Sequence, residues 1–183
     1  MHGIIHLELQ NFVVQHHGEA AWRALTDAAG LSSEIYTPLR SYPDEQLLAL
    51  VGAAVKLTGA DVTTLLEGFG EFLVPRYLTL YGKLLKPEWR TLDVLEHAED
   101  TIHRVVRLRE PGALPPRLQA QRVSASVIKL NYDSPRKLCA VARGIARGIA
   151  THFKEQLAIS DEQCMHRGDR LCVIRFTLVE AAG

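Results

Sequence analysis

The segment Tyr132-Asp133-Ser134-Pro135-Arg136 places a phenol, a hydroxyl and a guanidinium at alternate positions. In an extended chain such side chains project to one side. The forked donors of the Arg136 guanidinium and the hydroxyls of Tyr132 and Ser134 together suit an acidic ligand. Ser134 followed by proline is also a typical start for a helix, and the two interpretations are compatible.

His103 stands at the end of a segment with helical spacing of apolar residues that begins at Leu92. Imidazole is a common ligand of metals and of haem iron. A single histidine among apolar neighbours is more often a structural residue. The position alone therefore leaves both roles open.

Three cysteines form the third group with potential chemistry. Cys164 and Cys172 flank a short turn and are expected to face each other across a hairpin, while Cys139 lies at the start of a helix. Three thiolates with Asp161 or His166 as a fourth donor would make a tetrahedral zinc site. The alternative is three buried cysteines that act as small hydrophobes, which the absence of a Cys-x-x-Cys pair favours.

The elements expected to position these groups change midway along the chain. The first hundred residues have mainly helical periodicity. The expected helices are an N-terminal one ending near Gly18, then Ala20 to Ala29, one starting at Ser41-Tyr42-Pro43-Asp44-Glu45, Asp61 to Leu73, and Leu92 to His103. Pro75 is expected to break or kink the chain.

After His103 the apolar residues tend to alternate, which predicts strands. The expected elements are a strand at Val105 and Val106, one at Ile128 to Tyr132, a helix from Arg136 to Leu157, and a final strand from Cys172 to Leu178. The prediction is an α+β fold with a mainly helical N-terminal part and a C-terminal antiparallel sheet with a packed helix. No repeat or linker divides the chain, so residues 1–183 are expected to form one domain.

The composition excludes several classes of function. Lysine plus arginine equals aspartate plus glutamate at 21 each, so the charge gives no reason to bind nucleic acid or an anionic membrane. No apolar run approaches the roughly 20 residues of a membrane span, and the N-terminal residues lack the basic region and apolar run of a signal peptide. A cytoplasmic protein is predicted. No Cys-His or Ser-His-Asp spacing indicates a nucleophile, so an enzyme is not expected.

The order of these residues resembles the haem nitric oxide/oxygen-binding (H-NOX) family, stand-alone bacterial type, related to the haem domain of soluble guanylate cyclase. The resemblance rests on His103, on Pro115-Pro116-Arg117 and on the Tyr-x-Ser-x-Arg motif at Tyr132, and it extends to the N-terminal segment Met1-His2-Gly3-Ile4-Ile5 and to Tyr42-Pro43-Asp44-Glu45. It covers the chain from Met1 to about Val179.

The resemblance implies a b-type haem held between the helical part and the sheet. His103 would be the proximal iron ligand, and Tyr132, Ser134 and Arg136 would hold the propionates. Pro116 would press the macrocycle out of plane, and Ile5 would pack against it.

The resemblance also predicts which gases bind. Family members that hold oxygen have a tyrosine five residues after the motif arginine, where this chain has Val141. The other distal positions, Leu9 and Leu73 or Val74, are also apolar. Bound oxygen needs a hydrogen-bond donor, whereas NO and CO need little help. Binding of NO and CO without a stable oxygen complex is therefore expected.

Some bacterial members bind zinc through three cysteines and a histidine near the C-terminus. Cys139, Cys164 and Cys172 match that pattern, but Asp161 occupies the histidine position. Zinc with Asp161 or His166 as the fourth ligand, and a metal-free cluster that senses oxidation, both follow from the resemblance.

The implied function is a haem-based NO sensor. NO would weaken the bond to His103, and the resulting conformational change would regulate a partner in trans, a histidine kinase or a cyclic-di-nucleotide enzyme. The alternatives are a zinc or thiol redox sensor that uses the cysteines, and a binding module that holds a small hydrophobic molecule without haem.

Overall fold

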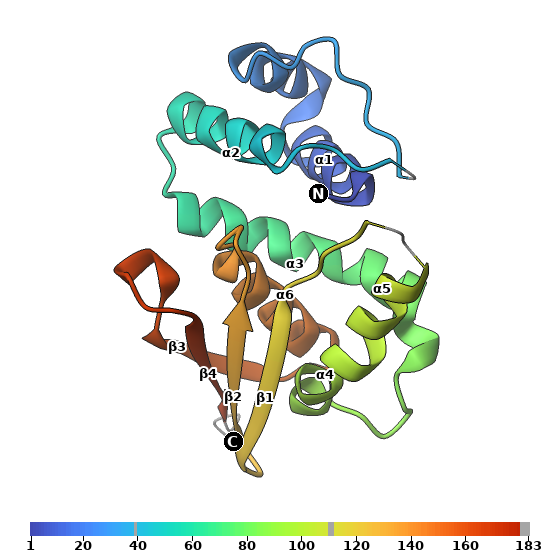
Figure 1. Cartoon of the computed structure of the whole chain (residues 1–183), viewed down its shortest axis with the longest axis vertical. Coiled ribbons are helices and arrows are strands. Elements are labelled where there is room, and N and C mark those ends of the chain that lie inside the picture. Colours follow the sequence, from blue (N-terminus) through green and yellow to red (C-terminus); the bar gives the residue numbers. More distant parts are fainter. Residues whose placement is uncertain (39, 110–111, 180–183) are drawn as a thin grey trace.

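The structure is a computed structural model that describes residues 1–38, 40–109 and 112–179. It has the expected α+β order, with helices first and a four-stranded sheet afterwards. The long helices of the first part are α1 (Gly3–Ala28), α2 (Asp44–Thr58) and α3 (Val62–Tyr81). Figure 1 shows α1 and α2 together at the top, the sheet below, and α3 crossing the molecule between them.

Gly18 divides α1 into two halves, as the sequence predicts. Its φ of 82° lies in the left-handed region that glycine adopts without steric cost, so the helix changes direction there. Pro43 stands immediately before α2, and Gly59 ends that helix with a left-handed conformation. Gly18 and Pro43 thus lie at two helix boundaries that the sequence predicts, whereas the end of α2 at Gly59 was not predicted.

Pro75 does not end α3, which continues to Tyr81 and then tightens into a 3₁₀ turn at Gly82–Leu84. The next helical stretch consists of α4 (Thr91–His97), a π-helical turn at Glu99–His103 and α5 (Arg104–Arg109). The predicted strand at Val105 and Val106 is therefore wrong, because both residues belong to α5. Two adjacent valines are too short a run to separate a strand from a helix.

The sheet is antiparallel throughout, in the order β1-β2-β4-β3. Its strands are β1 (Arg117–Ser124), β2 (Val127–Asp133), β3 (Gln156–Gln163) and β4 (Cys172–Val179). Helix α6 (Cys139–His152) packs on it through Ala146 and Ile149. The predicted helix from Arg136 to Leu157 was too long at both ends, since Leu157 already belongs to β3. A 3₁₀ turn at Met165–Arg167 precedes β4.

Two apolar cores lie on either side of α3. One joins the sheet, α4 and α6, and the other joins α1, α2 and α3. Helices α3 and α6 cross closely at two glycines: a Cβ on Gly70 would meet the carbonyl oxygen of Val141, and one on Gly144 would meet that of Glu67. Glycine is needed at this crossing because the two backbones touch.

Within the described ranges, no single helix has the length and apolarity to cross a bilayer. The pair Asp44–Thr58 and Val62–Leu84 meets that test of length and composition only when taken together, across a bend of 117°.

Candidate functional site

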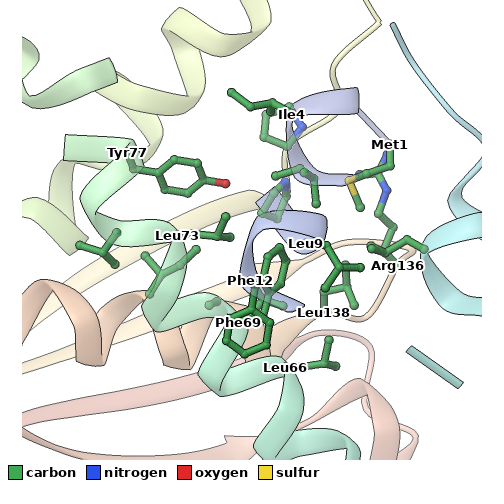
Figure 2. Close-up of a pocket in the computed structure, with 18 of the residues that line it drawn as sticks. Met1, Ile4, Leu9, Phe12, Leu66, Phe69, Leu73, Tyr77, Arg136 and Leu138 are labelled. Carbon is green, nitrogen blue, oxygen red and sulfur yellow. The ribbon is translucent and has the colours of Figure 1, made fainter. Parts of the chain in front are cut away.

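A cavity of about 560 Å³ lies between the two cores. This volume is within the roughly 300–1,000 Å³ of pockets that enclose small organic ligands. Figure 2 shows Leu9 and Phe12 from α1 and Phe69 and Leu73 from α3 turned into it. Its wall is thus mainly apolar, which suits a large hydrophobic group.

His103 supplies the cavity with a potential iron ligand. Its side chain is 17% exposed and lies at the end of the π-helical turn. The imidazole Nδ1 is 3.1 Å from Oε2 of Glu99, four residues earlier, which leaves Nε2 for a ligand. Burial lowers the pKa of His103 below its ordinary value, although the Glu99 carboxylate opposes this shift. The imidazole is therefore neutral at pH 7, the form that binds a metal.

Glu99 connects this histidine to the sheet. Its Oε2 also accepts a hydrogen bond of 3.1 Å from the backbone N–H of Leu118 in β1, and its Oε1 lies 2.7 Å from Nη1 of Arg107. Burial alone would raise the pKa of Glu99, but these donors hold it below the usual range. The carboxylate stays ionised and fixes the orientation of the His103 ring.

Tyr132, Ser134 and Arg136 reach the same cavity from the end of β2 and the turn after it. Tyr132 and Ser134 are each 3% exposed, and burial raises the pKa of Tyr132 to about 12, so its phenol remains a donor. Ser134 Oγ accepts from the backbone N–H of Arg136 at 3.3 Å, so it stabilises the turn; α6 itself begins later, at Cys139.

Asp44 positions the Arg136 guanidinium. Arg136 Nε donates to Asp44 Oδ2 at 2.8 Å, and its Nη1 donates to the Leu114 carbonyl at 2.5 Å. The Met1 ammonium contacts the other oxygen of Asp44 at 2.6 Å. Burial alone would raise the pKa of Asp44, but these two cations hold it below the ordinary value. The result is a positively charged end of the cavity, where Figure 2 shows Met1 and Arg136 side by side.

The structure brings together all the residues that the sequence assigns to haem. The cavity is lined by Ile5, His103, Pro116, Tyr132, Ser134, Arg136 and Val141. One nitrogen ligand, an apolar enclosure and a cationic, hydroxyl-bearing end are what an iron porphyrin with two carboxylates requires. The residues present fit a haem group.

Comparison with known families agrees with this fit. The family model described as haem-NO-binding matches residues 2–161. The chain belongs to the haem-NO-binding family.

Solved H-NOX structures have the same architecture. An S. oneidensis H-NOX protein in the Fe(II)NO state is 26% identical with a TM-score of 0.91, over 98% of this chain and 100% of that one. An H-NOX domain from Shewanella oneidensis in the Fe(II)CO state is 27% identical with a TM-score of 0.85, over 99% and 100%. An H-NOX protein mutant from K. algicida is 23% identical with a TM-score of 0.87, over 100% of this chain and 98% of that one. At this level of identity the comparison supports a shared fold and nothing further. No curated protein matches the chain.

This chain is therefore an H-NOX domain, and it belongs to a family of haem-based gas sensors. H-NOX domains are sensor modules rather than catalysts. Homologues have been solved with NO and with CO on ferrous iron. The family match covers His103 and the Tyr132–Arg136 segment, which together line the cavity of this domain.

The wall of the H-NOX cavity formed by α1, α3 and the start of α6 is largely apolar. Leu9, Leu73, Val74 and Val141 all line it, in line with the sequence. Tyr77 adds a phenol from α3, and Figure 2 shows its hydroxyl pointing into the cavity. No expectation from the sequence included Tyr77, although its spacing of four residues from Leu73 would have placed both on one face of a helix.

Cys139, Cys164 and Cys172 also form a group in this H-NOX domain. Cys164 Sγ lies 4.0 Å from Cys139 Sγ and 3.9 Å from Cys172 Sγ, and all three sulfurs lie within 4.8 Å of one another. All three residues are buried and have free thiols. Burial raises the pKa of Cys172 to about 12 and also raises the pKa of Cys139, so without a metal the thiols of Cys139 and Cys172 stay protonated.

The two residues expected as a fourth zinc donor have other partners. Asp161 Oδ2 accepts a hydrogen bond of 2.9 Å from Nη1 of Arg143, and His166 Nε2 lies 2.7 Å from the backbone oxygen of Lys137. Arg143 Nη1 is also 3.9 Å from Cys139 Sγ. A guanidinium thus stands between the thiols and the carboxylate. The arrangement offers three of the four ligands that structural zinc requires.

Two residues with clear roles in the site, Asp44 and Arg143, have no local signal in the sequence. Asp44 is 92 positions from Arg136, and Arg143 meets Asp161 only because α6 packs beside β3. Glu99 is different, because its spacing of four residues from His103 predicts a contact on a helix.

Proposed function

We propose that this H-NOX domain is a haem-based sensor of NO that also binds CO. The observation that carries the proposal is the convergence of His103 and the Tyr132–Arg136 segment on one apolar cavity. Bound haem would supply a ferrous iron with a free coordination position for a gas. NO and CO need no donor from the protein, so an apolar wall is sufficient for them.

The residues of this chain would perform distinct tasks. His103 would hold the iron through Nε2, while Glu99 keeps the ring in place and attached to β1. Tyr132 and Ser134 would donate hydrogen bonds to the haem carboxylates, and Arg136 would supply positive charge. Pro116 and Ile5 would pack against the macrocycle.

Signalling would depend on the connection between the two cores. We expect NO to release His103, which would free α5 to move relative to the helical wall that carries Ile5 and Leu9. A partner that binds one arrangement more tightly would respond to the change. We propose a histidine kinase or a cyclic-di-nucleotide enzyme as that partner and the cytoplasm as the location.

The test is the visible spectrum of the purified ferrous protein, alone and with NO or CO. A strong Soret band that shifts with each gas and is lost in His103→Ala is expected. The matched control is His152→Ala, which removes an exposed imidazole at the end of α6. A protein that takes up no haem when supplied with it, or a band that survives in His103→Ala, would overturn the proposal.

A second function is supported by the three clustered thiols. We propose that Cys139, Cys164 and Cys172 bind zinc, with the last coordination position filled by Asp161, by His166 or by a molecule from solvent. Either side chain would first have to leave its present partner. Metal analysis of the protein purified without chelators tests this directly, with Cys164→Ser expected to abolish binding.

A further inference from the structure

The haem cavity and the cysteine group share one side chain, that of Tyr132. It lines the cavity, and it also belongs to the buried cluster that contains Cys139, Cys164 and Cys172. Strand β2 lies next to β4 in the sheet (Figure 1), and Tyr132 stands directly opposite Cys172 in the antiparallel register. Side chains at opposite positions share one face, with Cβ atoms about 4.5–5.5 Å apart. The tyrosine expected to hold a haem carboxylate is therefore the cross-strand neighbour of a thiol.

The Tyr132 hydroxyl also contacts the turn that leads to Cys139. Burial raises the pKa of Tyr132 to about 12, although hydrogen bonds from the side chain of Ser134 and the backbone of Leu138 oppose this rise. Both donors belong to the turn after β2, and Cys139 follows Leu138 directly. The phenol accepts these bonds with its oxygen, so its own proton is left for a haem carboxylate. Tyr132 and the turn thus form one unit between the carboxylate end of the cavity and two of the thiols.

The spacing of the thiols is close to the spacing that a metal imposes. In tetrahedral geometry, zinc–sulfur bonds of about 2.3 Å hold each pair of sulfurs about 3.8 Å apart. Cys164 Sγ lies 4.0 Å from Cys139 Sγ and 3.9 Å from Cys172 Sγ, and all three sulfurs lie within 4.8 Å of one another. Binding of zinc would bring all three pairs to one spacing. It would thereby fix Cys139 and Cys172, the two thiols connected to Tyr132.

We propose that the cysteine group regulates the haem site: zinc held by its thiols stabilises Tyr132 in the position that binds a haem carboxylate. This inference rests on both proposed functions, haem binding and zinc binding. Without metal, the loss of conformational entropy on ordering Tyr132 and its turn opposes haem binding. With zinc bound, that ordering is already complete. Zinc should therefore strengthen haem binding, and by reciprocity haem should strengthen zinc binding by the same factor.

The experiment measures the rate at which haem-loaded protein loses haem to an acceptor protein, under reducing conditions that keep the thiols free. One sample contains one equivalent of zinc, and the other is treated with a chelator. Haem loss is expected to be about tenfold slower with zinc, within the roughly 5- to 150-fold range of coupled sites. The control is Cys164→Ser, which removes one zinc ligand and keeps Cys139 and Cys172. Zinc should not change the rate of haem loss in this variant.

Two further variants test whether Tyr132 makes the connection. Tyr132→Phe removes the hydroxyl that joins the haem carboxylate to the turn, so haem loss should be faster and zinc should slow it by twofold or less. The matched control is Ile5→Ala, because Ile5 lines the cavity from the core of α1, α2 and α3. This variant should also lose haem faster, but zinc should still slow the loss about tenfold.

Zinc affinity gives an independent measurement of the same coupling. The zinc dissociation constant of the wild type should be about tenfold lower in haem-loaded than in haem-free protein. Equal haem loss with and without zinc, or a full zinc effect in Tyr132→Phe, would overturn the inference and leave both sites standing. A wild type that takes up no haem, or one that binds no zinc, would overturn the corresponding proposed function and the inference with it.

Discussion

Nδ1 of His103 lies 3.1 Å from Oε2 of Glu99, and the same carboxylate oxygen accepts the backbone N–H of Leu118. The histidine that would hold iron is thus connected by one side chain to the first strand of the sheet. The contact forms within a π-helical turn, a distortion that is frequent at functional sites. A movement of His103 would therefore be transmitted through Glu99 to β1.

Glu99→Gln should weaken the hold on haem. A neutral amide accepts a weaker hydrogen bond from the imidazole, so the His103 ring becomes a poorer electron donor. Changes of this kind typically lower metal affinity about 10- to 100-fold. The measurements are the iron–histidine stretching frequency, expected to fall, and the rate of haem transfer to an acceptor protein, expected to rise.

Glu96→Gln is the control for this change. Glu96 is a neighbouring carboxylate that pairs with Arg122 at 2.6 Å and does not contact His103. Equal iron–histidine frequencies in wild type and Glu99→Gln would show that Glu99 does not orient the ligand.

Gly144→Ala should destabilise the fold at the crossing of α3 and α6. The new Cβ would meet the carbonyl oxygen of Glu67, so the helices must separate. Overpacking of this kind costs about 1–3 kcal/mol of the free energy of unfolding. Gly52→Ala is the matched control, because nothing lies within 4 Å of its Cβ in α2, and it should stabilise by about 0.5–1 kcal/mol. Urea denaturation measures both, and equal loss in the two variants would contradict the prediction.

The parts of the site that the sequence predicts are those defined locally. His103 and the Tyr132–Arg136 motif lie in short segments whose spacing is visible in the chain, and both line the cavity. Gly18 and Pro43 mark helix boundaries for similar reasons, because their backbone preferences act on single residues.

The parts that could not be predicted depend on packing between distant segments. The ion pair of Arg136 with Asp44 forms only after β2 and α2 are placed beside the cavity. Strand β3 (Gln156–Gln163) is not predicted from the sequence, because Leu157 also continues the helical pattern of the preceding segment. At Val105 and Val106 the sequence predicts a strand, but both residues lie in α5, the helix that follows the π-helical turn.

Asp161→His should convert the cysteine group into a tighter zinc site. In the wild type the Asp161 carboxylate is paired with Arg143 at 2.9 Å, which competes with a metal for that oxygen. A neutral imidazole would not be held by the guanidinium and would complete the four ligands that structural zinc prefers. The zinc dissociation constant, measured by competition with a chromogenic chelator, is expected to fall at least tenfold. His166→Ala is the control, and if it abolishes zinc binding in the wild type, His166 is the fourth ligand instead.

His6 should make the protein less stable in mild acid. It is fully buried in α1, its ring stacks on Tyr36 at 4.6 Å, and within the described part of the chain neither ring nitrogen has a hydrogen-bond partner. Burial lowers the pKa of His6 from 6.5 to about 4. Between these values the unfolded chain binds a proton that the folded chain does not, so stability falls as the pH falls from 6.5 and levels off below 4.

The shift corresponds to a loss of about 3 kcal/mol at the acid end. His6→Phe keeps an aromatic ring beside Tyr36 and removes the titrating group, so its unfolding free energy should change less between pH 6.5 and 4.5. His16→Phe, which alters an exposed residue of the same helix, should keep the wild-type slope. Urea denaturation at several pH values gives the slope for each protein. Parallel curves for wild type and His6→Phe would mean that another group causes the acid sensitivity.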